Sequence, residues 1–545
     1  MLSLAILMLT IVTNTAQAKE STVTGAKELD VDKGDSGPLP AMPVDVRVGS
    51  GTKVTSEETS SKVFSTARPT ASVEKTTETV KKPSMSSEKF PSPTTMPSTK
   101  LTTKSTINTT TTPTTKPTTK RTTKWTTKRT KKLTRKSTLT TTTKPISTPT
   151  PQKPLPPDSL LCTLREGFTR STMQFPPDGL CTIITFYDFI KDPVVTPISS
   201  YNEDFSYFLE TARIHQNTEY GIGINYGLCK NHTSVSTLVN RPTTKRLLDT
   251  LWGDRVYHFG QVHQLIRGQR LQPEVTGTLA KCLQMVSALM NDKKDSVSRP
   301  SYTVLHFPLL KRQWAGIVAR QLRIYPVDIF VAIAHHSEPD YRYTDCHMVP
   351  PTITSKRLLR HVPSKAYPVR LGNTIWSLAV DTDKWPPNIT FAVSLGMAGR
   401  WYRPKYPDVK PGTPGNYTLG FPCAAEEYSP RGQMVNVTEA CIDQRYSGNF
   451  RFDRIYTSEF TYNKKEKWLF TYDTARALRV KLCETKRNMT QLHYTFAAVN
   501  IQFEDAKDYC GYGEFPRLRA LKVLAHFFAF EYTSPDNETA CLKAT

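Results

Sequence analysis

The stretch Leu492–Leu521, LHYTFAAVNIQFEDAKDYCGYGEFPRLRAL, decides the fold because it holds three segments of different character. Thr495–Ile501 is a short, nearly continuous apolar run, which is typical of a strand buried on both faces. A charged loop with one cysteine follows over Glu504–Gly513, and Phe515–Phe528 is amphipathic. This order predicts the last strand of a parallel barrel, the loop over its mouth and the closing helix.

Short apolar runs alternate with helix-like segments from Leu160 onward, which favours a parallel α/β architecture. The expected strands are Leu160–Thr163, Leu180–Tyr187, Tyr220–Tyr226, Arg255–Val262, Ser301–Phe307, Val327–Ala334, Ile389–Met397 and Thr495–Ile501. The expected helices are Phe205–Ile214, Thr243–Leu251, Thr276–Met290, Leu310–Leu322, Asn373–Val380, Thr474–Glu484 and Phe515–Phe528. Eight strands with intervening helices predict a (β/α)8 TIM barrel. A doubly wound open sheet is the alternative, because the fourth strand pattern is weak.

The segment from Trp401 to about Lys467 interrupts this alternation. It is rich in Pro, Gly and Tyr and contains Cys423 and Cys441. We therefore expect a small α+β insertion after the seventh strand. Because the two cysteines frame the insertion, we expect them to form a disulfide.

The N-terminal part of the 545-residue chain differs from the rest in composition. Leu2–Val12 is an apolar core followed by Ala16-Gln17-Ala18, a small-residue cleavage pattern. This predicts a cleaved signal peptide over residues 1–18, with an uncleaved anchor as the alternative. No later stretch approaches about 18 uninterrupted apolar residues, so we do not expect the mature chain to span a membrane.

Residues 19–157 predict a disordered, mucin-like arm rich in Thr, Ser, Pro and Lys. Between Leu101 and Thr150 nearly half the residues are Thr, and there are 12 Lys and Arg but no Asp or Glu. The arm is either a solvated spacer or a cationic tether for acidic mucins, acidic glycans or other anionic surfaces. We do not expect it to bind nucleic acid, because Trp125 is the only aromatic residue of this block.

Residues 158–545 hold all ten cysteines, and an even count in one region suggests disulfides formed in an oxidising compartment. The chain also carries a series of N-x-T glycosylation sequons, and together these features predict a secreted, extracellular glycoprotein. The sequons begin at Asn108, Asn231, Asn388, Asn416, Asn436, Asn488 and Asn537.

Four groups of residues, in order along the chain, resemble the motifs of one enzyme family. They are Leu161-Cys162-Thr163 with Leu180-Cys181-Thr182, Ser394–Arg400 (SLGMAGR), Tyr456 with Trp468–Asp473 (WLFTYD), and Glu504-Asp505 with Cys510–Gly513 and Phe515-Pro516. From Leu160 to Phe528 the chain resembles the chitinases and chitinase-like lectins of glycoside hydrolase family 18. The resemblance implies a barrel, a Cys162–Cys181 disulfide and a sugar-binding cleft at the barrel mouth.

The catalytic motif of that family, DxxDxDxE, is absent from the chain. With Gly260 aligned to the motif's glycine, the acidic positions are occupied by Phe259, Val262, Gln264 and Ile266. The sugar-stacking Trp of the family's last strand is replaced by Val499, and its Met-x-Tyr-Asp motif by Ile333–His336. Without a general acid the leaving group departs unassisted, at a cost of roughly 10² to 10⁴ in rate. We therefore expect no enzymatic activity.

Several residues remain candidates for ligand binding. Trp401 and Tyr402 could stack on sugars, with packing of the insertion as an equal alternative that also applies to Tyr406, Tyr417 and Tyr428. The same alternatives, binding or ordinary polar and packing roles at the mouth, apply to Tyr187, His335 and His336. We expect no cofactor and no metal: His335, His336, Asp340, His258 and His263 lack a zinc-site spacing, and adjacent histidines on a strand point to opposite faces.

The sequence thus predicts a secreted, catalytically inactive chitinase-like barrel that binds chitin or related glycans, or acts as a matrix or mucin component. The alternative is a secreted non-carbohydrate effector or structural mucin that uses the barrel as a scaffold. An active chitinase with relocated acids is the third and weakest hypothesis.

Overall fold

The computed structural model describes residues 154–195, 202–262, 271–297, 299–336, 345–354, 362, 367–380, 382–407, 417–424, 431 and 434–545. The expected signal peptide and nearly all of the expected arm lie outside these residues. So do Gln264, Ile266, Asn108 and Asn416.

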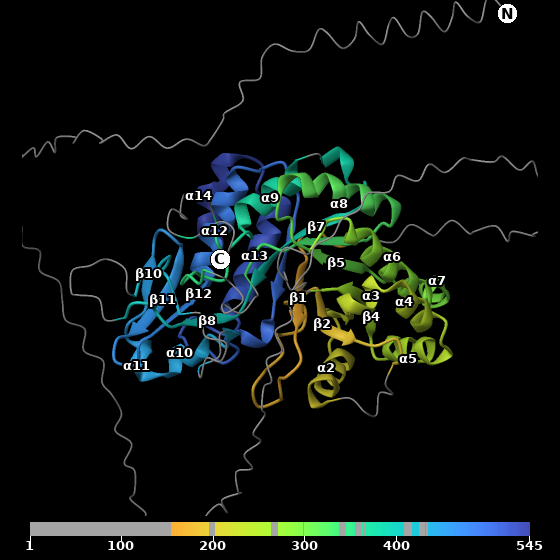
Figure 1. Cartoon of the computed structure of the whole chain (residues 1–545), viewed down its shortest axis with the longest axis horizontal. Coiled ribbons are helices and arrows are strands. Elements are labelled where there is room, and N and C mark those ends of the chain that lie inside the picture. Colours follow the sequence, from red (N-terminus) through yellow and green to blue (C-terminus); the bar gives the residue numbers. More distant parts are fainter. Residues whose placement is uncertain are drawn as a thin grey trace, which may run out of the picture. The chain divides into compact units, whose positions relative to one another are not determined.

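The folded part is built on a closed barrel of eight parallel strands in the order β1-β13-β7-β6-β5-β4-β3-β2 (Figure 1). The strands are β1 (Leu160–Leu164), β2 (Ile183–Ile190), β3 (Glu219–Ile224), β4 (Val256–Gln261), β5 (Thr303–Phe307), β6 (Ile329–Ala332), β7 (Thr390–Gly396) and β13 (Thr495–Val499). The TIM-barrel prediction is confirmed, and the alternative of an open sheet is wrong because β1 and β13 pair along their length.

The stretch Leu492–Leu521 contains the strand that closes the barrel. β13 lies between β1 and β7, with Phe496 opposite Leu160 and Thr495 opposite Ala392. All five residues of β13 are buried, as its continuous apolar pattern predicts.

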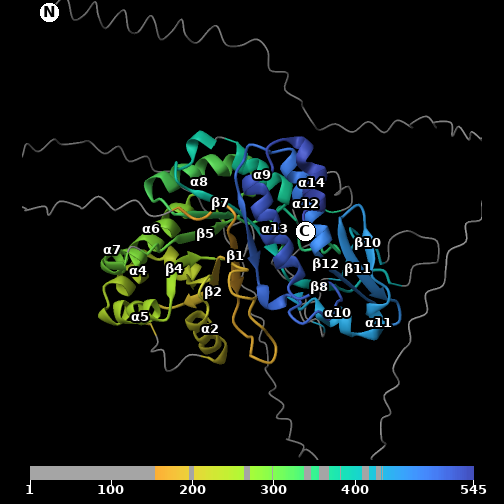
Figure 2. The same cartoon turned by 180° about the vertical axis from the view of Figure 1, so that it is seen from behind.

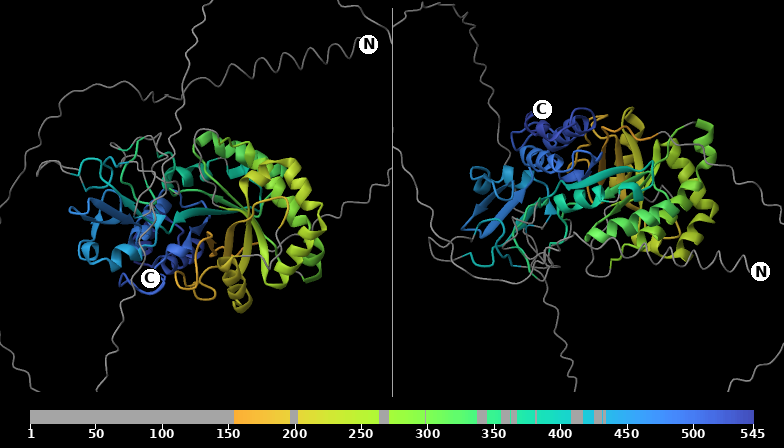
Figure 3. Two further views of the ribbon diagram at one scale, coloured as in Figure 1. Left: turned by 60° about the horizontal axis from the view of Figure 1, so that its bottom comes forward. Right: turned by 90° about the horizontal axis from the view of Figure 1, so that it is seen from above.

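Helices surround the strands and cover their outer face (Figure 3). Those that follow the strands or connect them are α2 (Glu203–Ile214), α3 (Tyr226–Lys230), α4 (His232–Val239), α5 (Pro242–Gly253), α6 (Val275–Ala288), α7 (Asn291–Val297), α8 (Arg312–Ile324), α9 (Leu371–Ala379), α12 (Ala475–Arg487) and α13 (Pro516–Phe530). The short helix α14 (Glu538–Lys543) lies beside α12 near the C-terminus (Figure 2).

The start and end of α12 illustrate why these segments are helical. The Thr474 side chain caps the first turn by accepting a hydrogen bond from the backbone N–H of Ala477, and Lys486 and Arg487 occupy the last turn. A hydroxyl at the N-cap and cations at the C-terminus both favour helix formation. The apolar face of the helix contributes Leu478 and Leu482 to the main core.

The period of two along each strand divides its side chains between two cores. Outward-facing residues such as Ile184, Ile222 and Phe259 pack against the helices in the main core. Inward-facing residues such as Ile183 and Val304 fill the barrel interior in a separate cluster.

A five-stranded sheet, in the order β10-β11-β12-β8-β9, forms the insertion after β7. Its elements are β8 (Gly399–Tyr402), β9 (Met434–Val435), α10 (Thr438–Ile442), α11 (Gln444–Ser447), β10 (Arg451–Asp453), β11 (Ser458–Asn463) and β12 (Trp468–Tyr472). The sheet begins at Gly399 and ends at Tyr472, slightly outside the expected 401–467. It is wider because the SLGMAGR and WLFTYD motifs supply its strands β8 and β12. Three short 3-10 turns complete the elements: η5 (Thr382–Lys384), η6 (Ile501–Phe503) and η7 (Pro535–Asn537).

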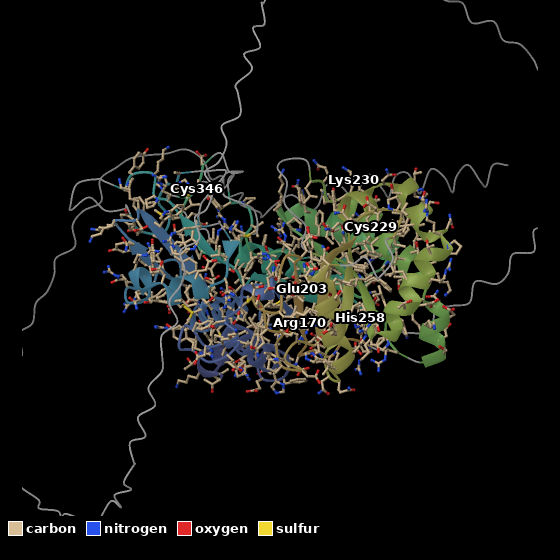
Figure 4. All side chains as sticks on the ribbon, turned by 90° about the horizontal axis from the view of Figure 1, so that it is seen from below. Arg170, Glu203, Cys229, Lys230, His258 and Cys346 are labelled. Atoms are coloured by element: carbon tan, nitrogen blue, oxygen red, sulfur yellow. A yellow bond between two sulfur atoms is a disulfide. The ribbon has the colours of Figure 1, made fainter. Side chains whose placement is uncertain are left out.

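All ten cysteines form disulfides. The pairs are Cys162–Cys181, Cys229–Cys282, Cys346–Cys423, Cys441–Cys510 and Cys483–Cys541. The Cys162–Cys181 pair is the one that the family resemblance implies. Figure 4 shows Cys346 beside the insertion and Cys229 among the helices on the other side of the barrel.

The expected Cys423–Cys441 disulfide is wrong. Cys423 lies on a short backbone ladder with the loop after β6, where its N–H donates to the carbonyl of Cys346. Cys441 lies on α10, which faces the loop after β13 that carries Cys510. The two cysteines therefore join the insertion to the barrel at two places and do not close the insertion on itself.

None of the helices in the described ranges is long and apolar enough to cross a membrane.

Candidate ligand site at the barrel mouth

The end of β4 carries no acidic side chain as far as the structure describes it. Phe259 points outward into the helix-facing core, and Gly260 and Val262 face the interior. Val262 is 2% exposed and packs within the interior cluster of apolar residues. The general acid that the family resemblance implies would come from this strand end, and the described part of β4 holds no carboxyl group.

The ends of β5, β6 and β13 carry no acidic side chain either. Val499, at the end of β13, is fully buried, and its carbonyl accepts a hydrogen bond from the N–H of Met397 just beyond β7. Val304 and Val331 fill the interior on β5 and β6. On these strands the interior is a packed apolar core.

His335 and His336, just beyond β6, point to different surroundings, as adjacent residues of an extended segment should. The Nδ1 atom of His335 lies 2.7 Å from the Ser394 hydroxyl on β7. The His336 ring packs edge-on against Tyr367, with 5.2 Å between ring centroids. Both side chains are buried, at 2% and 4% exposure, so neither presents a ring surface on which a sugar could stack.

The other members of the histidine group do not join them. His258 lies on β4 and hydrogen-bonds through Nε2 to Glu219, while its Nδ1 accepts from the N–H of Tyr302. His263 and Asp340 lie outside the described residues. Within the described ranges no group of three or more His, Cys, Asp or Glu side chains could hold a metal ion.

The structure buries the two aromatic residues expected to stack on sugars. Trp401 is 1% exposed, its Nε1 donates to Glu439, and Arg431 lies over its ring at 4.5 Å. Tyr402 is 2% exposed, and its hydroxyl donates to the carbonyl of Val349. Neither ring presents a free face, which supports the packing alternative for both. Both pack the cores of the insertion, because a small sheet needs aromatic bulk to exclude water.

Of the other aromatic residues of this region, Tyr417 is also buried, Tyr406 is exposed, and Tyr428 lies outside the described residues.

Tyr187 is the one expected binding residue that is partly exposed. It lies where the end of β2 becomes irregular. Between Phe186 and Ile190 the pairing with β3 is interrupted, and Asp188 has a φ of 53°. Asp tolerates this left-handed conformation better than most residues. A Cβ on Gly223 would lie 2.6 Å from the backbone nitrogen of Asp188, so only glycine allows the two strands to approach this closely.

This irregular strand end opens a cavity of about 220 Å³ beside α2 and the loop after β1. The cavity lies at the carboxyl end of the strands, where barrel proteins place their functional residues. It is lined by Glu166, Phe186, Asp188, Phe189, Ile190, Lys191, Asp192, Val194, Val195, Asn202, Asp204, Phe205 and Leu247.

The polar groups of this pocket, which we call the β2 pocket, are mainly carboxylates. Glu166 is paired with Lys191. The Asp204 carboxylate accepts hydrogen bonds from the N–H groups of Gly167 and Phe205 and is fully used. Asp188 accepts a hydrogen bond, 2.8 Å long, from the side-chain nitrogen of Asn225, and the Tyr187 side chain also hydrogen-bonds to it.

Burial raises the pKa of Asp188, and Glu166 adds to the effect, while Asn225, Lys191 and Tyr187 oppose it. A half-buried carboxyl beside the stacked rings of Phe189 and Phe205 offers hydrogen-bond acceptors next to an apolar wall. Hydroxyl-rich ligands with one apolar face suit such a surface.

Asp188, Glu166 and Asp204 are not among the binding residues predicted from the sequence. A signal existed: Tyr187-Asp188 directly follows the apolar run of the second strand, and the residues after such a run lie at the barrel mouth. The interruption of the β2–β3 pairing between Phe186 and Ile190, which opens the pocket, could not be recognised in the sequence.

No protein-family model matches this sequence, and no curated protein matches it. Several solved structures are similar to the chain. A Group IV chitinase of Ostrinia furnacalis in complex with allosamidin has 10% identity and a TM-score of 0.49, over 68% of this chain and 99% of that one. The class V chitinase of Nicotiana tobaccum has 11% identity and a TM-score of 0.45, over 66% and 98% of the two chains.

A glycoside hydrolase family 18 N-acetylglucosaminidase from Paenibacillus barengoltzii has 9% identity and a TM-score of 0.44, over 67% of this chain and 98% of that one. The structural neighbours are thus chitinases and a related glycosidase, while the barrel assignment rests on the strand pairing of this chain itself.

Proposed function

We propose that this chain is an exported protein whose chitinase-like barrel does not hydrolyse glycosidic bonds and instead binds a glycan at the β2 pocket. The observation that carries the proposal is the end of β4, where buried Val262 occupies a position that the family reserves for an acid. Glycoside hydrolysis by the family's route also needs a carboxylic acid to protonate the leaving group. The alignment puts Ile266, which lies outside the described residues, at that position.

Glycan binding is supported by the chemistry of the β2 pocket. Its carboxylates can accept hydrogen bonds from sugar hydroxyls, and Phe189 supplies an apolar surface for the ring. Because Trp401 and Tyr402 are buried and offer no stacking surface, we place the glycan site at β2 and not at the insertion.

Export is supported by the use of every cysteine in a disulfide, which is typical of oxidising compartments. The basic, Thr-rich stretch before the barrel would then attach the protein to acidic mucins or other anionic surfaces, as a matrix component does.

The inactivity proposal is tested with a chromogenic chitooligosaccharide and the purified full chain. We expect no product above the protein-free blank, with an active chitinase as the positive control. Product release by the wild type that Asp188→Asn abolishes would contradict the proposal, because it would identify Asp188 as a relocated acid.

Glycan binding is tested by sedimentation with insoluble chitin at about 1 M NaCl, where a Debye length of about 3 Å screens the basic arm. We expect the wild type to be retained and Asp188→Asn to bind about three- to tenfold more weakly, since one acceptor and its charge are lost. Asn tolerates the left-handed backbone at this position, and exposed Asp536→Asn serves as the matched control. Absence of retention of the wild type at micromolar concentration would sink the proposal.

A second candidate function is that of a scaffold without a carbohydrate ligand. The burial of Trp401 and Tyr402 favours it, because both expected stacking surfaces are used internally. Failure of chitin binding together with an intact fold would favour this candidate.

A further inference from the structure

Three cationic or basic side chains gather in the protein interior where β6, β8 and α9 approach one another. His336 follows β6, Arg400 lies on β8, and Arg370 is the N-cap residue of α9. Their exposures are 4%, 0% and 4%. Full burial of two guanidinium groups is rare unless each has a counter-charge.

Backbone contacts fix the three residues relative to one another. Arg400 donates from Nη1 to the carbonyl of His336 at 3.1 Å, and Arg370 donates from Nε to the carbonyl of Tyr367 at 3.4 Å. The His336 ring packs on the Tyr367 ring.

One loop also holds both sides of the cluster. The N–H of His336 donates to Pro351, and the N–H of Leu371, next to Arg370, donates to Ile353. The cluster is therefore rigidly built from several elements.

Arg370 is the unbalanced member of this cluster. Within the described part of the chain no carboxylate pairs with it, and its Nη2 atom is buried without a hydrogen-bond partner. The Nε2 atom of His336 is buried without a partner as well. A buried donor left unpaired costs about 1–3 kcal/mol, and a charged one costs more.

Arg370 is the member of the cluster that lacks a negative partner within the described residues. Burial, together with Arg400 and Arg370, lowers the pKa of His336 to about 3. Burial also lowers the pKa of Arg370. A buried water would satisfy the two orphaned atoms but would leave the charge of Arg370 uncompensated.

We propose that Arg370, with the His336 ring beside it, forms a binding site for a small oxyanion, a carboxylate or a sulfate. A planar guanidinium suits such an anion because its N–H groups form parallel hydrogen bonds to two oxygens. The anion comes either from solution or from an acidic sugar. This inference does not depend on glycan binding at the β2 pocket, because it rests on other residues.

The test is a titration of the full chain with sodium sulfate at constant ionic strength, followed by thermal unfolding and calorimetry. We expect saturable stabilisation of the wild type and at least about tenfold weaker binding by Arg370→Gln. Without sulfate, Arg370→Gln should melt no lower than the wild type, because it removes an uncompensated charge. Exposed Arg320→Gln on α8 is the matched control and should bind like the wild type.

Two further arms sharpen the test. Binding to the basic arm would be non-saturating and unchanged in Arg370→Gln, so it is distinguishable from this site. Glucosamine 6-sulfate binding at least about tenfold tighter than sulfate would identify an acidic sugar as the source; equal affinity would identify the free anion.

His336→Gln is the second variant, since it keeps the backbone carbonyl that Arg400 contacts. It should weaken sulfate binding while Arg370 stays in place. If neither variant folds, the wild-type titration still decides. Absence of saturable stabilisation of the wild type, or equal sulfate affinity in Arg370→Gln, would overturn the proposal in favour of a buried water.

Discussion

Lys486 is buried near the end of α12 among three aromatic rings. Its ammonium lies within 6 Å of the ring centroids of Tyr494, Phe528 and Tyr532 and donates to the carbonyls of Thr490 and Leu492. Burial lowers its pKa to about 8. The amine therefore changes charge within an accessible pH range.

We predict that replacing Lys486 by Met removes a pH-dependent part of the stability. The folded-state pKa of about 8 lies below the unfolded value of 10.5, so between these values the unfolded chain holds a proton that the folded chain has released. The stability of the wild type should therefore rise with pH across this window, by about 3 kcal/mol relative to Lys486→Met. Urea unfolding of both proteins at pH 7.5, 9 and 10.5 measures the difference, in which the other titrating groups cancel. A difference that does not change with pH would contradict the burial of a charged amine here.

For single residues, the sequence shows which functional groups are present or missing but does not show which of them are buried. The absence of the DxxDxDxE acids could be read directly, and Val262 is buried in the interior. The burial of Trp401 and the unpaired state of Arg370 could not be predicted, because both depend on segments distant in sequence that close over them.

At the scale of elements, one buried network joins the insertion, the loop after β6 and α12. Asp473 lies at the end of β12, and its carboxylate pairs with Lys481 of α12 at 2.6 Å. The same carboxylate accepts from the N–H of Thr352 and the hydroxyl of Ser458. Every oxygen of this buried carboxylate is used, so the three segments are held in one arrangement.

We predict that Lys481→Met destabilises the protein by about 3–5 kcal/mol, because it leaves the Asp473 charge buried and unpaired. The double variant Lys481→Met/Asp473→Asn should recover part of this loss, since Asn is neutral. Its amide oxygen can still accept from the N–H of Thr352, and its amide nitrogen can donate to the Ser458 hydroxyl. Arg445→Met, which breaks an exposed pair with Asp443, is the control and should cost less than about 1 kcal/mol. Urea unfolding measures all three. A double variant as unstable as the sum of its single changes would show that the charge pairing is unimportant.

The Cys441–Cys510 disulfide joins α10 of the insertion to the loop after β13 across 69 residues. Loop-closure entropy predicts that Cys441→Ser/Cys510→Ser loses about 4 kcal/mol of stability. Because the bond connects two structural layers, the fluorescence of Trp401 and Trp468 in the insertion should change at lower urea than the far-UV signal. Cys229→Ser/Cys282→Ser, which opens a similar loop among the helices, should lose stability without separating the two signals. Coincident transitions in the first variant would contradict the prediction.

The elements themselves were largely predictable, because hydrophobic period and turn residues are local. Even the weak Arg255–Val262 pattern corresponds to a strand, β4. The disulfide partners of Cys423 and Cys441 were not predictable, since the pairing depends on how the insertion lies against two loops and not on the order of cysteines along the chain.

At the scale of the whole molecule, the sequons differ in accessibility. Asn231, Asn388 and Asn488 are exposed. Asn436 is half-buried, and its side-chain nitrogen donates to the carbonyls of Gln502 and Glu504. Since the glycan attaches to this nitrogen, its partial burial and its contacts with another loop oppose modification of the folded chain. The Asn488 nitrogen also donates, to the carbonyl of Glu484, but this residue is exposed and the contact lies within its own helix.

We predict that a chain secreted from eukaryotic cells carries glycans at Asn231, Asn388 and Asn488 and much less at Asn436. Enzymatic deglycosylation in heavy-oxygen water followed by peptide mass spectrometry gives the occupancy of each site. Gln at each exposed position should remove one glycan without changing the others. Full occupancy at Asn436 would show that modification precedes folding of this region.

The barrel was predictable from the sequence because short apolar runs alternate with helix-like segments in the order that a barrel requires. The β2 pocket was not, because it arises where the regular pairing of β2 and β3 is interrupted.

The pairing of β1 with β13 has a consequence for biosynthesis. Leu160 and its partner Phe496 are separated by 336 residues of sequence, and elongation at about 5–20 residues per second adds these in roughly 20–70 s. During that time β1 cannot pair with β13, because β13 has not yet been synthesised. An unpaired strand edge is prone to pair with another chain. The nascent protein therefore depends on chaperone protection until its last strand emerges.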